Sequence, residues 1–253
     1  MFTGIIKELG KVQKITRINT GLEIQIGCSI ITANMDLGDS LAVNGCCLTA
    51  KEFGLSYFKA DISFSTLKST TFGSMRAGDR VNLEDAITLK DKLGGHIVTG
   101  HIDDVGKIVD VKRIGDFYKL VVKIPKNLLG FAAPKGSFAI DGISLTISDV
   151  NMNNLDFAII PFTFENTNLK FKKPGSKVNL EVDLMARYLI NMAKYGGLQN
   201  TFSSGGSHQL ASQLTSAQAM EYLKILNIKD DIKNMSKERD KQLEEKLKKY
   251  GFK

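Results

Sequence analysis

Three side chains with chemical reactivity stand inside motifs of this 253-residue sequence: Cys47, His101 and Ser144. A cysteine thiolate is a nucleophile, an imidazole titrates near neutral pH, and a hydroxyl can relay a proton or orient a ligand. Two of them also have a plainer interpretation. Cys47 could simply line a pocket, and His101 could be a structural residue at a glycine-rich strand end. Both interpretations require elements that bring these positions to a common place.

Other kinds of reactive site are not indicated by the residue pattern. Cys46 and Cys47 are adjacent, which is poor geometry for a mutual disulfide, so one is interpreted as a small buried hydrophobe. The sequence lacks Cys and His at metal-ligand spacing, and it lacks dinucleotide, P-loop and serine-hydrolase motifs. We therefore expect no metal site. His96 is expected to shape its loop, and His208 is expected to have no role in the chemistry.

The chain repeats itself at an offset of 96 or 97 residues. Residues 3–12 match 99–108 at five of ten positions, 40–49 match 137–146 at five of ten, and 78–84 match 175–181 at five of seven. Three blocks in one order indicate a duplicated domain, since the period is too long for a solenoid unit. Two copies of one domain can pack about a pseudo-twofold axis.

Divergence within the shared motifs suggests two half-sites with unequal roles. Ile5 becomes His101, Cys47 becomes Ser144, and Asn44 becomes Asp141. Each change exchanges one chemistry for another at an equivalent position of the fold.

Short β-branched or alternating runs punctuated by Gly, Asn and Asp predict strands in both copies. The clearest runs are 22–26, 40–43, 55–58, 80–83 and 117–124. Many short strands with glycine turns favour a small closed barrel in each copy, because closure removes exposed edges. Residues 65–72 and 163–169 are rich in Thr and predict short helical turns capped by hydroxyls.

The pattern changes after Asp183, where apolar residues at helical spacing predict an amphipathic helix with Asp183 as its N-cap. The predicted domains are 1–97 and 98–184 for the barrels, 185–198 for the helix, and 199–253 for a flexible linker with a helical tail. The tail is read as a linker over 199–216 and helices over 217–226 and 236–250.

Composition favours a globular cytoplasmic protein, with 43% hydrophobic and 24% charged residues and a net charge of +7. The positive excess is spread along the chain, so a nucleic-acid surface is not expected. The sequence has no apolar run long enough to span a bilayer and no secretory leader at its start, so no membrane association is expected.

Several separate motifs resemble the riboflavin synthase family over about residues 1–195. They are Met1-Phe2-Thr3-Gly4-Ile5, Asn44-Gly45-Cys46-Cys47-Leu48-Thr49, Gly95-His96 with Gly100-His101-Ile102, Lys135-Gly136 with Asp141-Gly142-Ile143-Ser144-Leu145-Thr146, and 178–183. The resemblance implies an all-β fold of two tandem six-stranded Greek-key barrels followed by a C-terminal helix. It also implies homotrimers with residues 184–195 at the trimer core.

The implied reaction is a dismutation without cofactor. Two molecules of 6,7-dimethyl-8-ribityllumazine exchange a four-carbon unit and give riboflavin and 5-amino-6-ribitylamino-uracil. One barrel binds the donor and the other binds the acceptor, and the barrel of one subunit faces the non-identical barrel of its neighbour.

By motif position, the implied catalytic residues are Phe2, Cys47, His101, Ser144 and Asp183. His101 and Ser144 are expected to handle protons or orient the attacking group, Phe2 to wall or stack on the ring, and Cys47 to contact the ligand. The implied substrate contacts are Gly4, Ile5, Ile6, Cys47, Leu48, Thr49, Asp61, Ile62, Ser63, Phe64, Ser65, Thr66, Gly100, His101, Ile102, Lys135, Ser144, Leu145, Thr146, Ile160, Pro161, Phe162, Thr163, Phe164 and Glu165.

The ligand segments depart from the family pattern. Where the family has Glu-Thr-Leu, this sequence reads Ser65-Thr66-Leu67 and Phe162-Thr163-Phe164, so both glutamates are replaced. Two alternatives stay open: a lumazine-binding fluorescent protein that holds its chromophore without turnover, and an interaction module whose tail binds RNA or protein.

Overall fold

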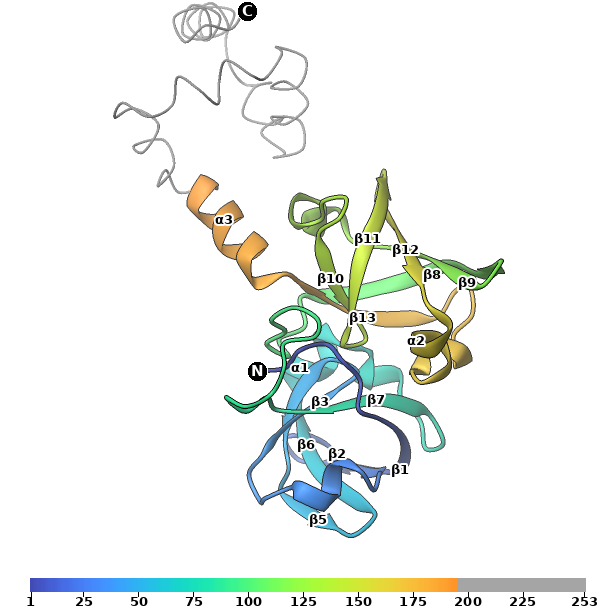
Figure 1. Ribbon diagram of the computed structural model, residues 1–253. Helices are drawn as coiled ribbons and strands as arrows, with labels where there is room; N and C mark the ends of the chain where they lie inside the picture. The colour runs from blue at the N-terminus through green and yellow to red at the C-terminus, as the bar shows by residue number, and fades with distance from the viewer. Residues whose placement is uncertain (195–253) are drawn as a thin grey trace, which may run out of the picture. The chain divides into compact units, whose positions relative to one another are not determined.

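The computed structural model describes residues 1–194 and contains two β-structures, one from each sequence repeat (Figure 1). The first comprises β1 (Glu8–Ile18), β2 (Gly21–Gly27), η1 (Ile31–Asn34), β3 (Ser40–Val43), β4 (Cys46–Thr49), β5 (Glu52–Gly54), β6 (Tyr57–Ser63), α1 (Phe64–Ser69), η2 (Thr71–Ser74) and β7 (Arg80–Asp85). The η labels denote 3₁₀ turns.

The second half repeats this order. It comprises β8 (Asp104–Ile114), β9 (Phe117–Lys123), η3 (Lys126–Phe131), β10 (Ser137–Ile140), β11 (Ile143–Asn151), β12 (Asn154–Ile159), α2 (Pro161–Glu165), η4 (Asn168–Phe171) and β13 (Lys177–Val182), followed by α3 (Leu184–Lys194). The predicted strand runs are confirmed except at Ile124, which follows the end of β9, and at Leu55 and Ser56. These two residues form the turn before β6, where Leu55 is 97% exposed, because the Gly54 end of β5 needs a tight connection.

The second half is a closed barrel with the strand order β10-β11-β12-β9-β8-β13. The first half has the equivalent order β4-β3-β7-β1-β2-β6-β5, in which the two outermost strands follow one another in the chain. Only Ala50 and Lys51 separate β4 from β5. The Lys51 N–H donates to the Lys59 carbonyl of β6 at 2.9 Å, so the hydrogen bonding to β6 continues across this break. The same place in the second half is a β-bulge between Ile147 and Asp149. The two-barrel all-β fold predicted from the sequence is therefore confirmed.

Alternation along the strands builds one apolar core in each barrel. Val12, Ile24 and Phe58 are fully buried in the first, and Ile108, Leu120 and Phe157 occupy the second. Burying side chains of this size contributes about 1.5–3 kcal/mol each. The cores are separate, so each repeat folds around its own interior.

Hydroxyl caps set the short helical turns, as predicted. Ser63 accepts from the Thr66 N–H at 3.2 Å at the start of α1, and Thr70 and Thr167 cap η2 and η4 in the same way. The exception is α2, which has no side-chain cap and begins with Pro161.

A third, smaller apolar cluster joins the two barrels. Phe2 and Val98 form an antiparallel bridge and pack with Ala42 and Ala139. At Gly45 and Gly142, the turns of the two repeats meet so closely that a Cβ on either would lie 2.6 Å from the other's backbone nitrogen. The repeats therefore contact each other through equivalent residues, as a pseudo-twofold arrangement requires.

Asp183 caps α3, as predicted, because its Oδ1 accepts from the Met185 N–H at 2.7 Å. No helix within residues 1–194 is long and apolar enough to cross a membrane. The predicted linker and helical tail lie outside the described residues, as do the last four positions of the predicted 185–198 helix.

Candidate active site

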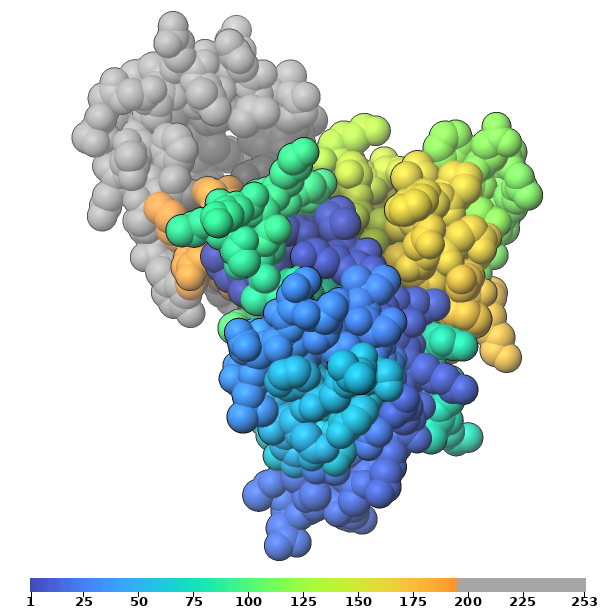
Figure 2. Space-filling view, turned by 60° about the horizontal axis from the view of Figure 1, so that its bottom comes forward, coloured from blue at the N-terminus to red at the C-terminus, as the bar shows by residue number. Residues whose placement is uncertain are grey.

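Each repeat sends its leading segment across to the other barrel. The Gly4 carbonyl accepts from the Ser144 N–H at 2.8 Å, and the Gly100 carbonyl accepts from the Cys47 N–H at 2.8 Å. In the space-filling view the N-terminal segment, dark blue, lies against the second barrel (Figure 2). Ile6 packs on the second core and Ile102 on the first. The fold therefore pairs residues 4–6 with Ser144 and residues 100–102 with Cys47; we call these the Ser144 half-site and the Cys47 half-site.

The crossing requires glycine at both positions. Gly4 has φ +74° and Gly100 has φ +83°, conformations that residues with a Cβ rarely adopt. A Cβ on Gly4 would lie 2.6 Å from the Cβ of Ser144, and one on Gly100 would lie 2.5 Å from the Cβ of Cys47. These contacts fix the backbone of residues 5 and 101 directly beside the two divergent side chains.

Two buried carboxylates hold the crossing segments. Glu84 accepts from Thr3 N at 2.6 Å, Thr3 Oγ1 at 2.7 Å and Gly4 N at 3.0 Å. Glu181 makes the equivalent three bonds to Thr99 and Gly100, at 2.7, 2.6 and 3.1 Å. Burial raises the pKa of both carboxyls, and the three hydrogen bonds act against that shift. Both are invariant in the repeated Val-Asn-Leu-Glu motif, which is the sequence signal for this role.

Strand alternation decides which predicted contacts face outward. Cys47 and Ser144 are half-buried, and Thr49 and Thr146 are exposed on the same strand face. The side chains of Leu48, Leu145 and Ile62 lie in the barrel cores, so these three predicted contacts offer only backbone groups. This is the consequence of a two-residue strand period that the family motif alone does not reveal.

The ligand segments of the two half-sites differ in polarity. In the first repeat, Ser63 Oγ lies 2.7 Å from Ser65 Oγ and 3.0 Å from Thr66 Oγ1, which makes a hydroxyl cluster. The second repeat has apolar residues instead, with Ile160 and Phe162 49% and 74% exposed. Phe164 stacks on Tyr118 at a centroid distance of 3.7 Å, which anchors α2 to β9. Asp61, Phe64 and Glu165 are exposed, and Thr163 is half-buried.

His96 contacts Ser144, which sequence reasoning did not anticipate. His96 Nδ1 lies 2.7 Å from Ser144 Oγ. Burial lowers the pKa of His96, and the charge of Asp183 acts in the opposite direction. Because His96 precedes the second repeat, it has no counterpart in the first, so comparison of the repeats does not reveal it.

The remaining predicted residues, His101, Phe2 and Lys135, differ in exposure and in surroundings. His101 is exposed beside the Cys47 half-site, and the described contacts do not bring it to Ser144. Phe2 is fully buried, and its Cε2 would lie 3.0 Å from a Cβ on Gly100, so it supports that loop from behind and has no exposed face for stacking. Lys135 is exposed with φ +69°, a strained conformation for a residue with a Cβ.

The three cysteines differ in environment. Burial raises the pKa of Cys28 and Cys46 to about 12. Cys46 is thus the buried small hydrophobe expected of one member of the pair, and Cys47 is the half-buried thiol.

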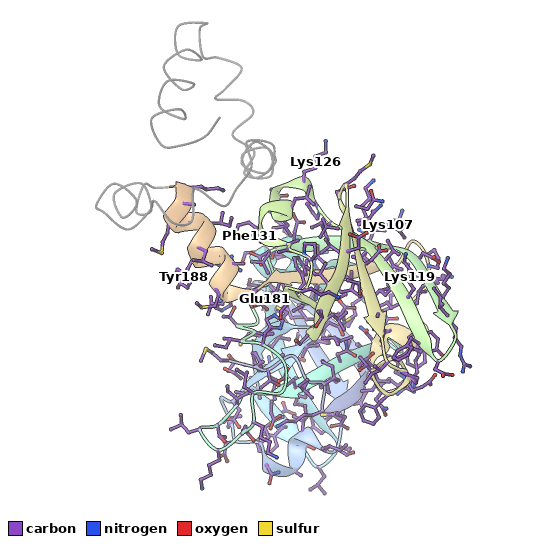
Figure 3. All side chains as sticks on the ribbon, turned by 45° about the horizontal axis from the view of Figure 1, so that its top comes forward. Lys107, Lys119, Lys126, Phe131, Glu181 and Tyr188 are labelled. Carbon is purple, nitrogen blue, oxygen red and sulfur yellow. The ribbon has the colours of Figure 1, made fainter. Side chains whose placement is uncertain are left out.

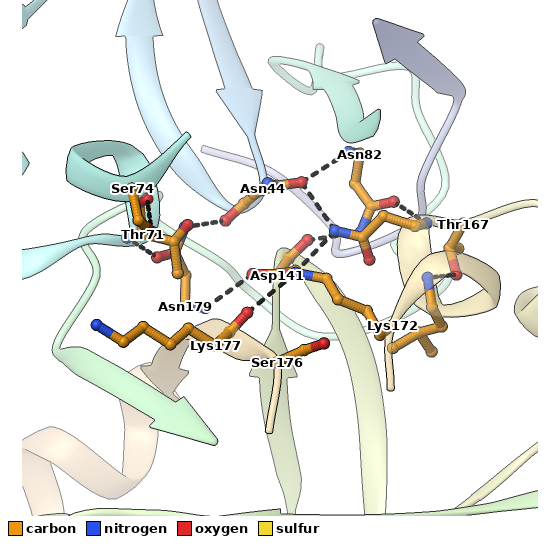
Figure 4. A network of polar contacts seen from close by, with 12 residues as sticks. Asn44, Thr71, Ser74, Asn82, Asp141, Thr167, Lys172, Ser176, Lys177 and Asn179 are labelled. Atoms are coloured by element: carbon orange, nitrogen blue, oxygen red, sulfur yellow. Dashed lines mark hydrogen bonds and ion pairs between the residues drawn. The ribbon is translucent and has the colours of Figure 1, made fainter. Parts of the chain in front are cut away.

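The expectation that Asn44 and Asp141 are paired site residues is wrong. Both lie in the interface between the barrels (Figure 4). Asn82 Nδ2 donates to the Asp141 carbonyl at 2.9 Å, and Asn179 Nδ2 donates to the Asn44 carbonyl at 2.8 Å. Asp141 is fully buried and is paired with Lys172 at 2.8 Å. These asparagines and Asp141 therefore join the repeats.

Comparisons with known proteins agree with this architecture. The family described as lumazine binding domain matches residues 3–86 and 99–183. Riboflavin synthase of Photobacterium leiognathi is 41% identical over 211 residues, covering 83% of this chain and 97% of the relative. Riboflavin synthase of Brucella abortus (strain 2308) is 38% identical over 200 residues, covering 77% and 99%.

Solved structures show the same likeness. LumP complexed with riboflavin has a TM-score of 0.68 at 28% identity, covering 72% of this chain and 99% of that one. LumP complexed with 6,7-dimethyl-8-(1'-D-ribityl) lumazine has a TM-score of 0.66 at 27% identity, with the same coverage. With two lumazine-binding domains and enzymes as relatives over most of its length, the chain belongs to the riboflavin synthase family.

Proposed function

We propose that this chain converts two molecules of 6,7-dimethyl-8-ribityllumazine into riboflavin and 5-amino-6-ribitylamino-uracil, the dismutation of a riboflavin synthase. The enzyme is a transferase that moves a four-carbon unit from a donor to an acceptor molecule. The atoms of the two products equal those of the two substrates, so the overall reaction needs neither oxidant nor water. The duplicated barrels supply one binding place for each substrate molecule.

The observation that carries the proposal is the pairing of each crossing segment with the divergent residue of the other barrel. It creates two backbone-lined half-sites of equal geometry and different chemistry: one with Cys47 and His101, the other with Ser144 and His96. Exposed Thr49 and Thr146 add hydroxyls that suit the donors and acceptors on a pteridine edge.

We assign roles by these contacts. Ser144 and His96 form a proton-relay pair for the 7-methyl group or for the attacking amine, and the charge of Asp183 acts on His96. His101 supplies the imidazole of the other half-site, and Cys47 contacts the ring there. Lys135 places a positive charge beside Ser144's strand, and the 61–66 and 160–165 segments cover the two rings.

Two half-sites must face each other for carbon transfer, and we propose that they come from different subunits of a homotrimer. Met185, Tyr188, Leu189 and Met192 form an apolar stripe on α3, between 50% and 64% exposed. A stripe at this helical spacing is a surface for another helix. Stacking two lumazines between subunits gives the reacting atoms a high effective concentration.

The primary test is the assay of purified full-length protein with the lumazine alone, following riboflavin by its absorbance. Riboflavin must accumulate in proportion to enzyme without added cofactor. Binding of the lumazine without riboflavin formation would instead identify the non-catalytic binding protein. A second preparation that ends at residue 198 shows whether the tail contributes to turnover.

A hybrid experiment tests the shared site. His101→Ala and Ser144→Ala variants each lose turnover, and mixed trimers assembled from both recover part of it, because some interfaces then join an intact Cys47 half-site to an intact Ser144 half-site. If both half-sites of one active centre belonged to the same chain, mixing would restore nothing.

Leu189→Asp, which places a charge in the apolar stripe of α3, is expected to give monomers in analytical ultracentrifugation and to abolish turnover.

A further inference from the structure

A separate pocket opens between the two barrels, apart from both half-sites. Its volume is about 290 Å³, and its lining includes Thr71, Asp79 and Arg80 from the first repeat and Asn168, Lys172 and Lys177 from the second. Several of these residues belong to the polar network in Figure 4. The pocket shares no lining residue with the lumazine contacts proposed above.

Positive charge converges on this pocket. Arg80 and Lys177 are equivalent residues of the two repeats, so the pseudo-twofold arrangement brings both to one cavity. Lys172 is neutralised by buried Asp141 at 2.8 Å, which leaves Asp79 as the one other carboxylate among the lining residues. Among the described residues, neither the Arg80 nor the Lys177 side chain forms an ion pair. With the Lys172–Asp141 pair neutral, the lining carries Arg80 and Lys177 against the single carboxylate of Asp79, so a net positive charge remains to attract an anion.

Two buried polar atoms, each in a residue that lines the pocket, have no partner within the described part of the chain. They are Asn168 Oδ1 and Thr71 Oγ1, in residues that are 1% and 8% exposed. The Asn168 amide is oriented by its Nδ2, which donates to Asn44 Oδ1 at 3.1 Å and to Asp141 Oδ2 at 2.8 Å. Asn168 Oδ1 is therefore a true acceptor that needs a donor, and a bare anion does not provide one.

We propose that this pocket binds a phosphate ester that also carries hydroxyl groups, a sugar phosphate in chemical class. The phosphate lies between Arg80 and Lys177, a ligand hydroxyl donates to Asn168 Oδ1, and the Thr71 hydroxyl bonds to the same ligand. Arginine recognises phosphate through paired N–H donors, and lysine adds a point charge. The volume is near the lower end of small-ligand pockets, which suits a small sugar phosphate.

Isothermal titration of the full-length protein with glucose 6-phosphate as the probe tests the proposal, with inorganic phosphate and glucose as reference ligands. We expect one site per chain and binding at least about tenfold tighter than that of either reference ligand. Arg80→Gln and Lys177→Gln are each expected to weaken binding roughly tenfold. Thr71→Val removes the buried hydroxyl with little change in shape and is expected to weaken it less.

The matched control is Lys126→Gln on η3, an exposed residue that does not line this pocket (Figure 3). It must bind the probe as the parent protein does. Equal binding of inorganic phosphate would overturn the proposal in favour of a simple anion site. An equal loss in the Lys126 variant, or no heat up to about 10 mM probe, would overturn it as well. If Thr71→Val does not fold, the two exposed cation variants decide the outcome alone.

Discussion

His96 Nδ1 lies 2.7 Å from Ser144 Oγ, although 48 residues separate them in the chain. The backbone fixes this contact from both sides, because the His96 N–H donates to the Thr3 carbonyl at 3.1 Å and the Ser144 N–H donates to the Gly4 carbonyl. His96 is buried, and burial lowers its pKa, so its ring is neutral near pH 7. A neutral imidazole beside a hydroxyl can exchange a proton with it.

His96→Gln is expected to lower kcat about 10²-fold and to change KM little, because glutamine fills the space but is not a base near neutral pH. Ser144→Ala is expected to cause a loss of similar size. The double variant should be no slower than the worse single variant, since residues that act as one unit are not additive. Multiplicative losses in steady-state assays would show that the two act independently.

The pH dependence of stability follows from the same histidine. Its folded pKa lies below the usual 6.5, so the unfolded chain binds the proton first as the pH falls. The free energy of unfolding is therefore expected to decrease as the pH falls below about 6.5, down to the folded pKa. His96→Gln should flatten this part of the profile in urea titrations. An unchanged slope in the variant would assign the effect to other groups.

The barrel fold was predictable because duplication doubles the signal: most strands, the bulge of the first strand and the caps of η2 and η4 occur twice at a fixed offset. Even the bulges match, between Val12 and Lys14 in β1 and between Ile108 and Asp110 in β8. Periodicity also predicted α3, since one face of it is apolar. The split of the fourth strand at Ala50 and Lys51 was not predictable, because it depends on local ladder geometry.

The site was predictable only in part. Repeat comparison identified Cys47, His101 and Ser144 as divergent positions, but it shows only which residues are equivalent in the two repeats. In the structure each crossing segment lies against the other barrel, so position 101 lies beside Cys47 and position 5 beside Ser144. Such an exchange is a tertiary relationship that no local pattern encodes. His96 was expected only to shape its loop, because it has no equivalent in the first repeat that would reveal its contact with Ser144. Asp141 was misassigned because its burial against Lys172 depends on how the barrels pack.

Gly100→Ala is expected to lower both turnover and melting temperature, because the new Cβ would lie 2.5 Å from the Cβ of Cys47 and must displace the segment that carries His101. The matched control is Gly115→Ala, which has φ +59° and no neighbour within 4 Å. It should cost only the backbone strain, about 1–2 kcal/mol, and leave turnover unchanged. A normal kcat in the Gly100 variant would contradict the geometry of the Cys47 half-site.

Alkylation should distinguish the three cysteines. Cys28 and Cys46 are buried, with pKa values raised to about 12, so few of their thiols ionise near pH 8. Iodoacetamide is expected to modify Cys47 first, as mapped by peptide mass spectrometry, and bound ribityllumazine should protect it. Modification of Cys46 at the same rate would contradict the assigned burial, and failure of the lumazine to protect Cys47 would remove it from the ligand site.

The Asp141–Lys172 ion pair is expected to be replaceable by the residues of the first repeat, Asn44 and Met75. Lys172→Met alone leaves the buried charge of Asp141 without its partner and should lower the free energy of unfolding by about 3–5 kcal/mol. Asp141→Asn alone leaves the charge of Lys172, which reaches solvent, so its loss should be smaller. The double variant should recover most of this loss, since a neutral and an apolar side chain already occupy the equivalent places in the other repeat. Urea denaturation of the four proteins measures the coupling between the two positions. Additive losses would mean that the pair contributes no coupling and that each residue acts through the asparagine network by itself.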